Sequence, residues 1–375
     1  VISSSDATQA CARTPPLCPS KLTSWLGGLP RPLGVPMLAL GSLRWARFSR
    51  LKTVRACATK GDASTSCEIE VWSFNLRTEK VEEEDSLNAW PERRQGVASL
   101  IAKHRPAVVC VQEATVAMLR DICLHLDGKY EWKATSRLPN EPDESAGFII
   151  DRGRAKILDY SVIWLSSPGV PDGIPSWDAR FPRTCEAVLL DILGSGGLIR
   201  VLNTHFDHQG STARLESARM ISESIARFSE RMPACAQILC GDFDSPKSSE
   251  PYAVLMGNLG PATQAARPLK DTFRCDGVVD TGGVQSTIHK WQGISFAEDR
   301  GDGTVDLSQG GGYDSRYIDW ILFLDGLPGN RGCTRLQPLQ SKVIIDSMAS
   351  GRYPSDHFPV STTFRVEIHT ERSRL

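Results

Sequence analysis

Several familiar signatures are missing from this 375-residue sequence. No run approaches the ~18 apolar residues that a membrane-spanning helix needs, and the longest candidate, at 32–43, is interrupted by proline. The eleven cysteines form no Cys-x-x-Cys pair, which favours a reduced protein over a disulfide framework. We therefore expect a chain with neither a membrane span nor structural disulfides.

Two common catalytic motifs are also missing. The sequence contains no Gly-x-Ser-x-Gly motif of serine hydrolases and no Gly-x-x-x-x-Gly-Lys-Ser/Thr loop that binds nucleotide phosphates. Because no activated nucleophilic side chain is visible, a covalent enzyme intermediate is not expected.

Positive charge is scarce in most of the chain. Nine of the 43 Lys and Arg residues, but only two of the 44 Asp and Glu residues, lie within 1–62, so the remainder carries a net charge of about -8. Wrapping of nucleic acid without sequence specificity requires many basic residues, and this acidic body argues against it. A divalent cation site and an ordinary solvated surface both remain consistent with the acidic excess.

Residues 1–62 differ in composition from the rest. They are rich in Ser, Thr, Ala, Pro and Arg, which is typical of a transit segment for a mitochondrion or plastid. A secretory signal, with its apolar stretch at 33–43, and a disordered tail are the alternatives. In each case we exclude 1–62 from the fold and place the folded domain at 63–375.

Apolar runs of strand length alternate with helical periodicity from Cys67 onward. Runs 67–75 and 107–113 predict strands on either side of a helix at 92–104, and apolar residues recurring at three and four predict a second helix at 212–232. Further strands are predicted at 146–151, 156–165, 185–192, 198–206, 236–242, 317–324 and 359–367. The pattern predicts an α/β fold in which two packed sheets are flanked by helices.

Several of the predicted strands end in acids, amides or imidazoles. Singly, each of these residues is typical of a turn, but strand ends on one edge of a sheet converge, and the gathered acids would repel one another without a cation. Carboxylate and amide oxygens suit Mg²⁺ or Mn²⁺, whereas zinc would call for more His or Cys. The residues are Asn75, Glu113, His205, Asp242, Asp244, Asp319, Asp356 and His357.

Hard cations, carboxylates and histidines together are suited to cleaving a phosphoester. The cation neutralises phosphate oxygens, a carboxylate orients or deprotonates water, and a histidine stabilises the charge that develops on the phosphoryl group. The sequence therefore predicts a metal-dependent phosphoesterase.

Nine motifs carry a resemblance to a known family. They are FNLR, NAWPERRQGVASLI, VQE, FPRTCEAVLLD, NTHFDHQGSTARLESARMI, GDFDS, TIHKWQG, YIDWILF and YPSDHFPV. In order and spacing the chain resembles the endonuclease/exonuclease/phosphatase superfamily over about residues 66–367, most of all its branch of small metal-dependent hydrolases. The resemblance implies a DNase I-like four-layer α/β sandwich.

The resemblance also implies roles for individual residues. Asn75, Glu113 and Asp356 match the metal site, with Glu113 as the principal Mg²⁺ ligand. Asp242 matches the carboxylate that activates water.

Three further residues complete the catalytic set that the resemblance implies. His205 and His357 match positions that contact the phosphate, and Asp319 matches an acid that orients a catalytic histidine.

One position departs from the family pattern. The family usually has GDFN where this chain has GDFD, so Asp244 replaces an amide that donates a hydrogen bond. An ionised carboxylate cannot donate. Asp244 therefore recruits a second cation, raises the pKa of Asp242, or weakens catalysis.

The substrate is predicted less sharply than the reaction. Candidate substrate-binding residues are Arg77, Arg183, Asp207, His208 and His289, for each of which a structural role is the alternative. The acidic body favours a small phosphorylated molecule or a single strand over duplex DNA. A nuclease is the first alternative, and a non-catalytic binding module with the same fold is the second; no protein partner is implied.

Overall fold

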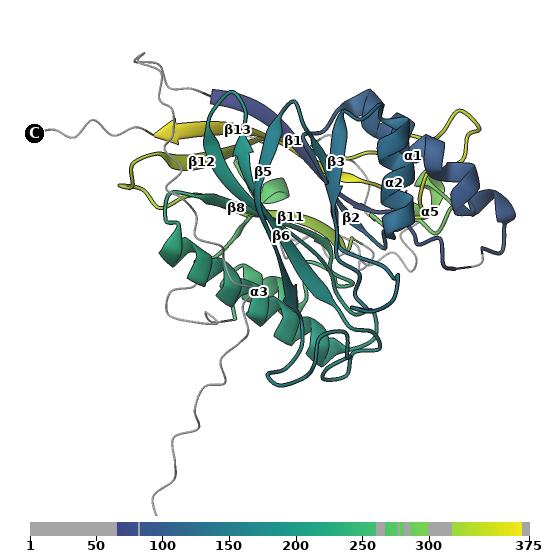
Figure 1. Ribbon diagram of the computed structural model, residues 1–375, viewed down its shortest axis with the longest axis horizontal. Helices are drawn as coiled ribbons and strands as arrows, with labels where there is room; N and C mark the ends of the chain where they lie inside the picture. Colours follow the sequence, from purple (N-terminus) through teal and green to yellow (C-terminus); the bar gives the residue numbers. More distant parts are fainter. Residues whose placement is uncertain are drawn as a thin grey trace, which may run out of the picture. The chain divides into compact units, whose positions relative to one another are not determined.

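Two β-sheets packed face to face form the framework of the protein (Figure 1). The computed structural model describes residues 66–81, 83–259, 267–276, 278–280, 286–298 and 317–369. The predicted N-terminal segment, 1–62, and its boundary with the folded domain lie outside these residues and stay predictions. No helix within the described ranges is both long enough and apolar enough to cross a bilayer.

The first sheet holds seven of the described strands and the second holds six. In spatial order the first contains β10 (Val279–Asp280), β12 (Cys333–Val343), β13 (Val360–His369), β1 (Ser66–Asn75), β2 (Val108–Gln112), β4 (Phe148–Asp151) and β3 (Tyr130–Lys133). The second contains β5 (Ala155–Trp164), β6 (Thr184–Ile192), β7 (Gly197–His205), β8 (Ala236–Asp242), β11 (Asp319–Leu324) and β9 (Lys270–Asp271). Each sheet mixes parallel and antiparallel pairs.

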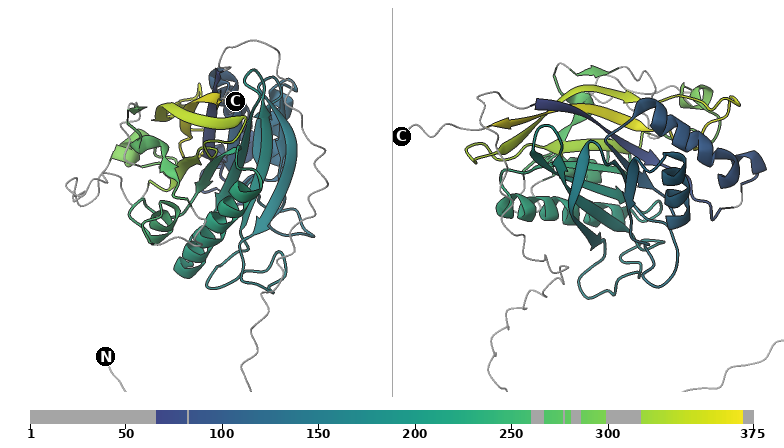
Figure 2. Two further views of the ribbon diagram at one scale, coloured as in Figure 1. Left: turned by 90° about the vertical axis from the view of Figure 1, so that its left-hand side faces the viewer. Right: turned by 45° about the horizontal axis from the view of Figure 1, so that its top comes forward.

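Helices cover the outer faces of the two sheets (Figure 2). Helices α1 (Trp90–His104) and α2 (Val116–His125) pack on the first sheet through an apolar cluster that includes Trp72 and Val109. Helix α3 (Ser211–Arg231) and the short α4 (Glu250–Leu255) cover the second sheet. This layering confirms the predicted two-sheet sandwich flanked by helices.

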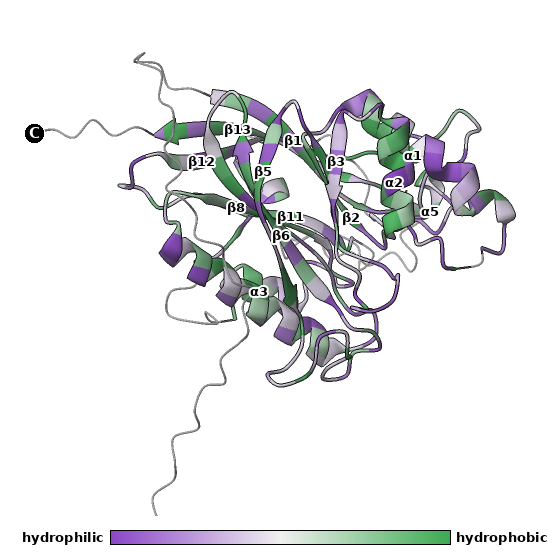
Figure 3. Ribbon diagram, viewed as in Figure 1, coloured by the Kyte–Doolittle hydropathy of each residue, from purple (hydrophilic) through white to green (hydrophobic). Residues whose placement is uncertain are grey.

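The sequence pattern explains both the buried strands and the amphipathic helix. Strands β2 and β8 lie between neighbours on both sides and are buried at every position, as their nearly continuous apolar runs predict. On α3, Ala218, Ile221 and Ile225 are buried against the second sheet. Figure 3 shows hydrophilic positions alternating with these along the helix, as expected for a helix with one solvent face.

Predicted and observed elements agree to within about two residues for most strands and for both predicted helices. Several elements were missed, including α2, β3 and β12. Strand β12 contains Pro338 and a register shift between Pro338 and Gln340, which hides its apolar alternation. Helix α2 begins where the Thr115 side chain accepts a hydrogen bond from the Met118 amide at 3.2 Å, a capping signal that the sequence does contain.

A polar contact joins the two sheets across their interface. Asn203 of β7 donates to the carbonyls of Val111 at 2.9 Å and Gly147 at 2.7 Å. Its Oδ1 accepts from Gln112 at 2.6 Å. Every hydrogen-bonding atom of this fully buried amide is therefore paired with the opposite sheet.

We expect Asn203→Ala to lower the free energy of unfolding by about 2–3 kcal/mol, because it leaves buried polar groups without partners. Urea unfolding monitored by circular dichroism measures this loss. The matched control is Asn258→Ala, at an exposed position, where a change within about 0.5 kcal/mol is expected. Equal losses in the two variants would contradict a stabilising role for the inter-sheet amide.

A second buried polar group makes stability depend on pH. Glu186 of β6 is fully buried and accepts hydrogen bonds from the Thr135 and Ala146 amides and the Tyr160 hydroxyl. Burial raises its pKa from an ordinary 4.5 to about 8, and these hydrogen bonds offset only part of the rise. Between pH 4.5 and about pH 8, Glu186 is therefore protonated in the folded protein but ionised in the unfolded chain.

Because the folded-state pKa is raised, the stability linked to Glu186 is present below pH 4.5 and is lost as pH rises towards 8. We expect the stability of the natural chain relative to Glu186→Gln to fall by up to about 1.4 kcal/mol per pH unit in that window. Urea titrations at pH 5, 6, 7 and 8 test this, with Glu230→Gln at an exposed position as control. A pH-independent difference would show that Glu186 is ionised in the folded protein.

Candidate active site

Strand ends from both sheets meet at one site. Asn75 ends β1, His205 ends β7, Asp242 ends β8 and Asp319 begins β11. Glu113 follows β2 directly, and Asp356 and His357 lie just before β13. The register aligns His205 with Asp242 and Asp242 with Asp319 on neighbouring strands. The structure therefore brings the predicted strand-end residues together.

The amide of Asn75 links the two sheets at this site. Its Nδ2 donates to Glu113 Oε1 at 3.0 Å and to Asp242 Oδ2 at 2.9 Å. Its Oδ1 accepts from the Arg77 backbone amide at 2.9 Å. One amide thus holds a carboxylate from the first sheet beside a carboxylate from the second.

Glu113 is held in a strained backbone conformation. Its φ of 57° lies in the left-handed region, which costs a residue with a side chain about 1–2 kcal/mol. Its Oε2 accepts from the Thr78 amide at 2.9 Å. Burial raises the pKa of Glu113, but electrostatic interactions with His205 and His357 and hydrogen bonds from Thr78 and Asn75 outweigh burial and lower it. Glu113 is therefore an anion poised to bind a cation.

Asp356 lies beside Glu113 on the other side of the site. Burial raises its pKa, the charge of Glu113 raises it further, and Arg77 and Arg93 oppose the rise. Arg77 Nε lies 4.0 Å from Asp356 Oδ2. Two neighbouring buried carboxyl groups are what a divalent cation would stabilise.

Asp242 occupies the centre of the cluster. It accepts hydrogen bonds from Asn75 and, at 3.0 Å, from the Asp244 backbone amide. Burial, Asp244 and Asp319 together raise the pKa of Asp242 to about 7. A carboxylate with such a pKa takes up a proton more readily than an ordinary aspartate.

His357 and Asp319 form a hydrogen-bonded pair. His357 Nδ1 lies 3.0 Å from Asp319 Oδ2, and its Nε2 lies 3.9 Å from Asp242 Oδ2. Burial lowers the pKa of His357, but the charge and hydrogen bond of Asp319 outweigh burial and raise it well above its usual value. His357 is therefore a cation whose Nε2 side faces Asp242.

His205 faces two carboxyl groups. Its Nε2 lies 3.3 Å from Asp244 Oδ2 and 3.8 Å from Asp242 Oδ2. Burial and the charge of Arg183 lower the pKa of His205 to about 4, whereas burial raises that of Asp244 to about 6. Asp244 also has a left-handed backbone, with φ of 45°. Its Oδ2 is buried without a hydrogen-bond partner.

The cluster fits a divalent cation. Ligand atoms of His205, Asp242 and Asp244 lie within 4.8 Å of one another, and so do those of Asp242, Asp319 and His357. Within the described residues, buried Asp244 Oδ2 and Asp319 Oδ1 have no hydrogen-bond partner. These oxygen-rich sets, together with Glu113 and Asp356, match the ligands that hard cations prefer.

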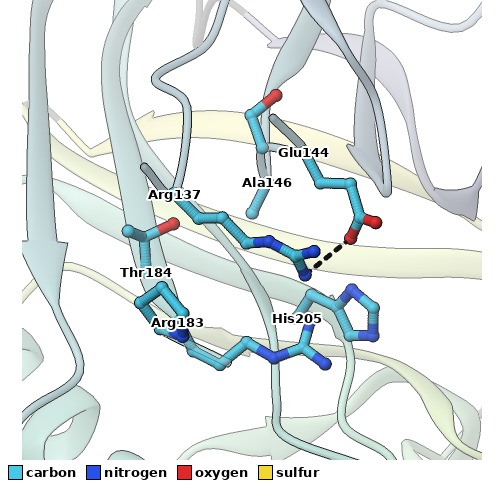
Figure 4. A pocket seen from close by; sticks show the side chains of 8 residues that line it. Arg137, Glu144, Ala146, Arg183, Thr184 and His205 are labelled. Carbon is cyan, nitrogen blue, oxygen red and sulfur yellow. Dashed lines mark ion pairs between the residues drawn. The ribbon is translucent and has the colours of Figure 1, made fainter. Parts of the chain in front are cut away.

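A pocket adjoins the cluster on the side of β6 (Figure 4). Its lining includes Arg137, Glu144, Ala146, Arg183, Thr184 and His205. Arg137 Nη1 pairs with Glu144 at 2.8 Å. Of these lining residues, only His205 belongs to the strand-end cluster, so the pocket extends the site away from Asp319.

Of the predicted substrate-binding residues, Arg183 lines the pocket, and exposed His208 lies beside it, with Nδ1 3.5 Å from Arg183 Nη2. Asp207 accepts hydrogen bonds from four backbone amides, those of Arg180, Phe181, Gln209 and Gly210. Asp207 therefore stabilises the backbone of the two segments that contain these amides. Its substrate-binding role stays a prediction.

His289 and Arg77 are also engaged within the fold. The His289 ring is fully buried near Tyr353 and Phe358 and accepts from the Gly293 amide at 3.2 Å. Arg77 donates to Glu83 at 2.7 Å. For both residues the structural contacts are plain, and contact with a substrate stays a prediction.

Sequence reasoning missed Arg93, which holds the loops of the site together. Its buried guanidinium donates to the carbonyls of Leu76, Arg77, Asn88 and Pro354. The neighbouring Arg94 of α1 instead pairs with Asp121 of α2 at 3.1 Å. A helical pattern with Trp90 three residues earlier could have singled out Arg93 as the buried member of the pair.

Arg137 and Glu144 were also missed. They lie between the predicted strands, and nothing in their local sequence indicates that this loop folds against β6.

Comparisons with known proteins agree with this geometry. The family model described as Endonuclease/Exonuclease/phosphatase family matches residues 72–357. No curated protein sequence matches the chain. Among solved structures, an endonuclease/exonuclease/phosphatase from Bacteroides vulgatus is 22% identical, with a TM-score of 0.63, covering 81% of this chain and 100% of that chain.

Two further structures share the fold. The mannosyl-6-phosphatase of Bacteroides thetaiotaomicron is 23% identical, with a TM-score of 0.61, covering 79% of this chain and 99% of that chain. TDP2 of D. rerio, complexed with a single strand DNA product, is 16% identical, with a TM-score of 0.53, over 79% and 98% of the two chains. At these identities the structures show a common fold, while the family match covers most of the folded residues. The chain therefore belongs to the endonuclease/exonuclease/phosphatase family.

Proposed function

We propose that the chain is a Mg²⁺- or Mn²⁺-dependent phosphoesterase that hydrolyses its substrate by direct attack of water. The observation that carries the proposal is the double hydrogen bond of Asn75, which holds Glu113 and Asp242 in one site. The family match supports the same class of reaction.

Glu113 and Asp356, with Asn75 beside them, would hold the cation. When bound, the cation would neutralise phosphate oxygens and stabilise the leaving oxygen. The remaining chemistry belongs to side chains of the chain.

Asp242 would orient the attacking water and accept its proton, for which its raised pKa suits it. His357, held by Asp319 and charged, would face the negative charge that develops on the phosphoryl oxygens. In the strand register, His205 and Asp319 are neighbours of Asp242 on opposite sides. His205 would therefore contact the phosphate from the side opposite Asp319.

The test is a hydrolysis panel with Mg²⁺, Mn²⁺ or EDTA. It includes sugar phosphates, phosphoinositides, a generic phosphodiester, RNA, and single-stranded and duplex DNA. We expect cation-dependent hydrolysis that falls by at least about a thousandfold in Glu113→Gln and Asp242→Asn. Asp172→Asn, at an exposed position, is the matched control and keeps full activity.

The panel also separates the alternatives. Preference for an oligonucleotide would favour the nuclease, and preference for a small phosphoester would favour the phosphatase. Cation binding without hydrolysis of any substrate would contradict the proposal that the chain is an enzyme and would favour a binding module.

Asp244 yields a separate prediction. Its unpartnered Oδ2 faces His205 across 3.3 Å and adds negative charge beside the place proposed for the phosphate. We expect Asp244→Asn to raise kcat/KM roughly tenfold, equivalent to about 1.4 kcal/mol, because the repulsion ends and an amide can donate. Steady-state kinetics on the preferred substrate of the panel measure the change. A fall in activity with a weaker response to Mg²⁺ would show instead that Asp244 binds a cation.

A further inference from the structure

Glu186 is a buried acid of the second sheet that contacts a loop of the first sheet. Its Oε1 accepts from the Thr135 and Ala146 amides, each at 3.2 Å, and its Oε2 accepts from the Thr135 amide at 3.1 Å. Thr135 and Ala146 lie near the two ends of the loop 134–147, which joins β3 to β4. One carboxyl group of β6 therefore holds both ends of this loop.

The acid is not needed to fill the core at this position. An apolar side chain would be buried without the cost of desolvating a carboxyl group. Such a side chain could not accept hydrogen bonds from the two loop amides. What Glu186 adds to the fold is therefore a fixed position for the loop 134–147.

The end of this loop supports the backbone next to Glu113. Ser145, which precedes Ala146, donates to the Ala114 carbonyl from its backbone amide at 2.9 Å and from its Oγ at 2.6 Å. Ala114 directly follows Glu113, whose left-handed φ of 57° persists only where the surroundings hold it. Glu186 is thus connected to Glu113 through hydrogen bonds of two adjacent loop residues.

The same loop also contacts the segment that donates to the Glu113 carboxylate. Lys80 Nζ lies 3.3 Å from Asp143 Oδ1, and Lys80 is two residues after Thr78, whose amide donates to Glu113 Oε2. The Lys80 side chain is 44% exposed, so this ion pair is weaker than the buried contacts of Ser145. The loop therefore supports Glu113 from two directions, and the support through Ser145 is the stronger.

We propose that Glu186 and Ser145 are positioning residues that hold Glu113 in the place where it binds the cation. This inference rests on the proposed function, because it takes Glu113 as a ligand of the cation. Displacement of the loop would shift Glu113 relative to the other carboxylates of the site, and residues that orient ligands strongly affect the affinity for a cation. Cation affinity should therefore depend on both residues, although neither belongs to the strand-end cluster.

Cation binding is measured without substrate. Isothermal titration calorimetry of the full chain with Mn²⁺ gives the dissociation constant, and loss of binding in Glu113→Gln identifies the site. We expect Glu186→Ala to weaken Mn²⁺ binding about tenfold or more. Glu186→Gln should keep the natural affinity at pH 7, because the raised pKa of about 8 keeps Glu186 protonated there and an amide oxygen accepts the same hydrogen bonds.

Gln237→Ala is the matched control for a loss of stability. Gln237 is buried in β8 near the end of the strand opposite Asp242, and its side chain donates to residues of α3. Like Glu186→Ala, this variant loses buried hydrogen bonds of the second sheet, but it should keep the natural Mn²⁺ affinity. Thermal unfolding of both variants compares their stabilities.

Ser145→Ala tests the connection through the loop, and it decides the question if Glu186→Ala does not fold. It removes one of the two hydrogen bonds to the Ala114 carbonyl and should weaken Mn²⁺ binding roughly threefold. Because both residues act through the same loop, the double variant should bind Mn²⁺ about as weakly as Glu186→Ala alone.

Three results would overturn the inference. They are equal Mn²⁺ affinities in Glu186→Ala and Gln237→Ala, natural affinity in Ser145→Ala, and losses that multiply in the double variant. If one of these is found while the natural chain shows cation-dependent hydrolysis, the proposed function stands and the positioning role fails. If Mn²⁺ binding depends on Glu186 and Ser145 but no substrate is hydrolysed, the positioning role stands and the proposed reaction fails.

Discussion

The geometry of the site depends on one amide group placed between two carboxylates. Glu113 and Asp242 come from different sheets, and their charges alone would push the sheet ends apart. The Asn75 amide donates one hydrogen to each, at 3.0 Å and 2.9 Å, and so replaces repulsion by two charge-assisted hydrogen bonds. A hydroxyl has one hydrogen and an ionised carboxylate has none, so neither could donate to both carboxylates as this amide does.

The surrounding structure supports that arrangement at a local cost. Glu113 and Asp244 both have left-handed backbones. The Glu113 carboxylate accepts hydrogen bonds from the Asn75 side chain and the Thr78 amide, and the backbone amide of Asp244 donates to the Asp242 carboxylate. Arg93 binds carbonyls on both sides of the site, at Leu76 and Pro354. Strained residues of this kind persist where the surroundings fix them firmly, as the sandwich does here.

Much of the fold could be predicted from the sequence because its strands are apolar and bounded by polar residues. Strand β8 was predicted with its observed bounds, and the polar residues that follow such strands led directly to Asp242 and His205. The polar edge strand β12 escaped because its apolar period is broken at Pro338. Strand ends are a local signal, and for that reason the central cluster was predictable.

Roles that depend on contacts between distant segments were not predictable. Asp207 and His208 adjoin in sequence, yet Asp207 turns inward to four backbone amides while His208 is exposed. Arg137 lines the pocket only because the loop that carries it folds against β6. Periodicity and composition carry no information on such three-dimensional neighbours.

The pairing of β1 with β13 has a consequence for the order in which the protein is made. Ser66 lies opposite Glu367, so the strand that carries Asn75 gains this neighbour only after nearly all of the described chain has been synthesised. Asp356 and His357 arrive at the same late stage. Contacts this far apart in sequence form slowly, and a ribosome-bound chain that has not yet emerged as far as β13 lacks an assembled site. The topology thereby delays assembly of the site until nearly all of the domain has been translated.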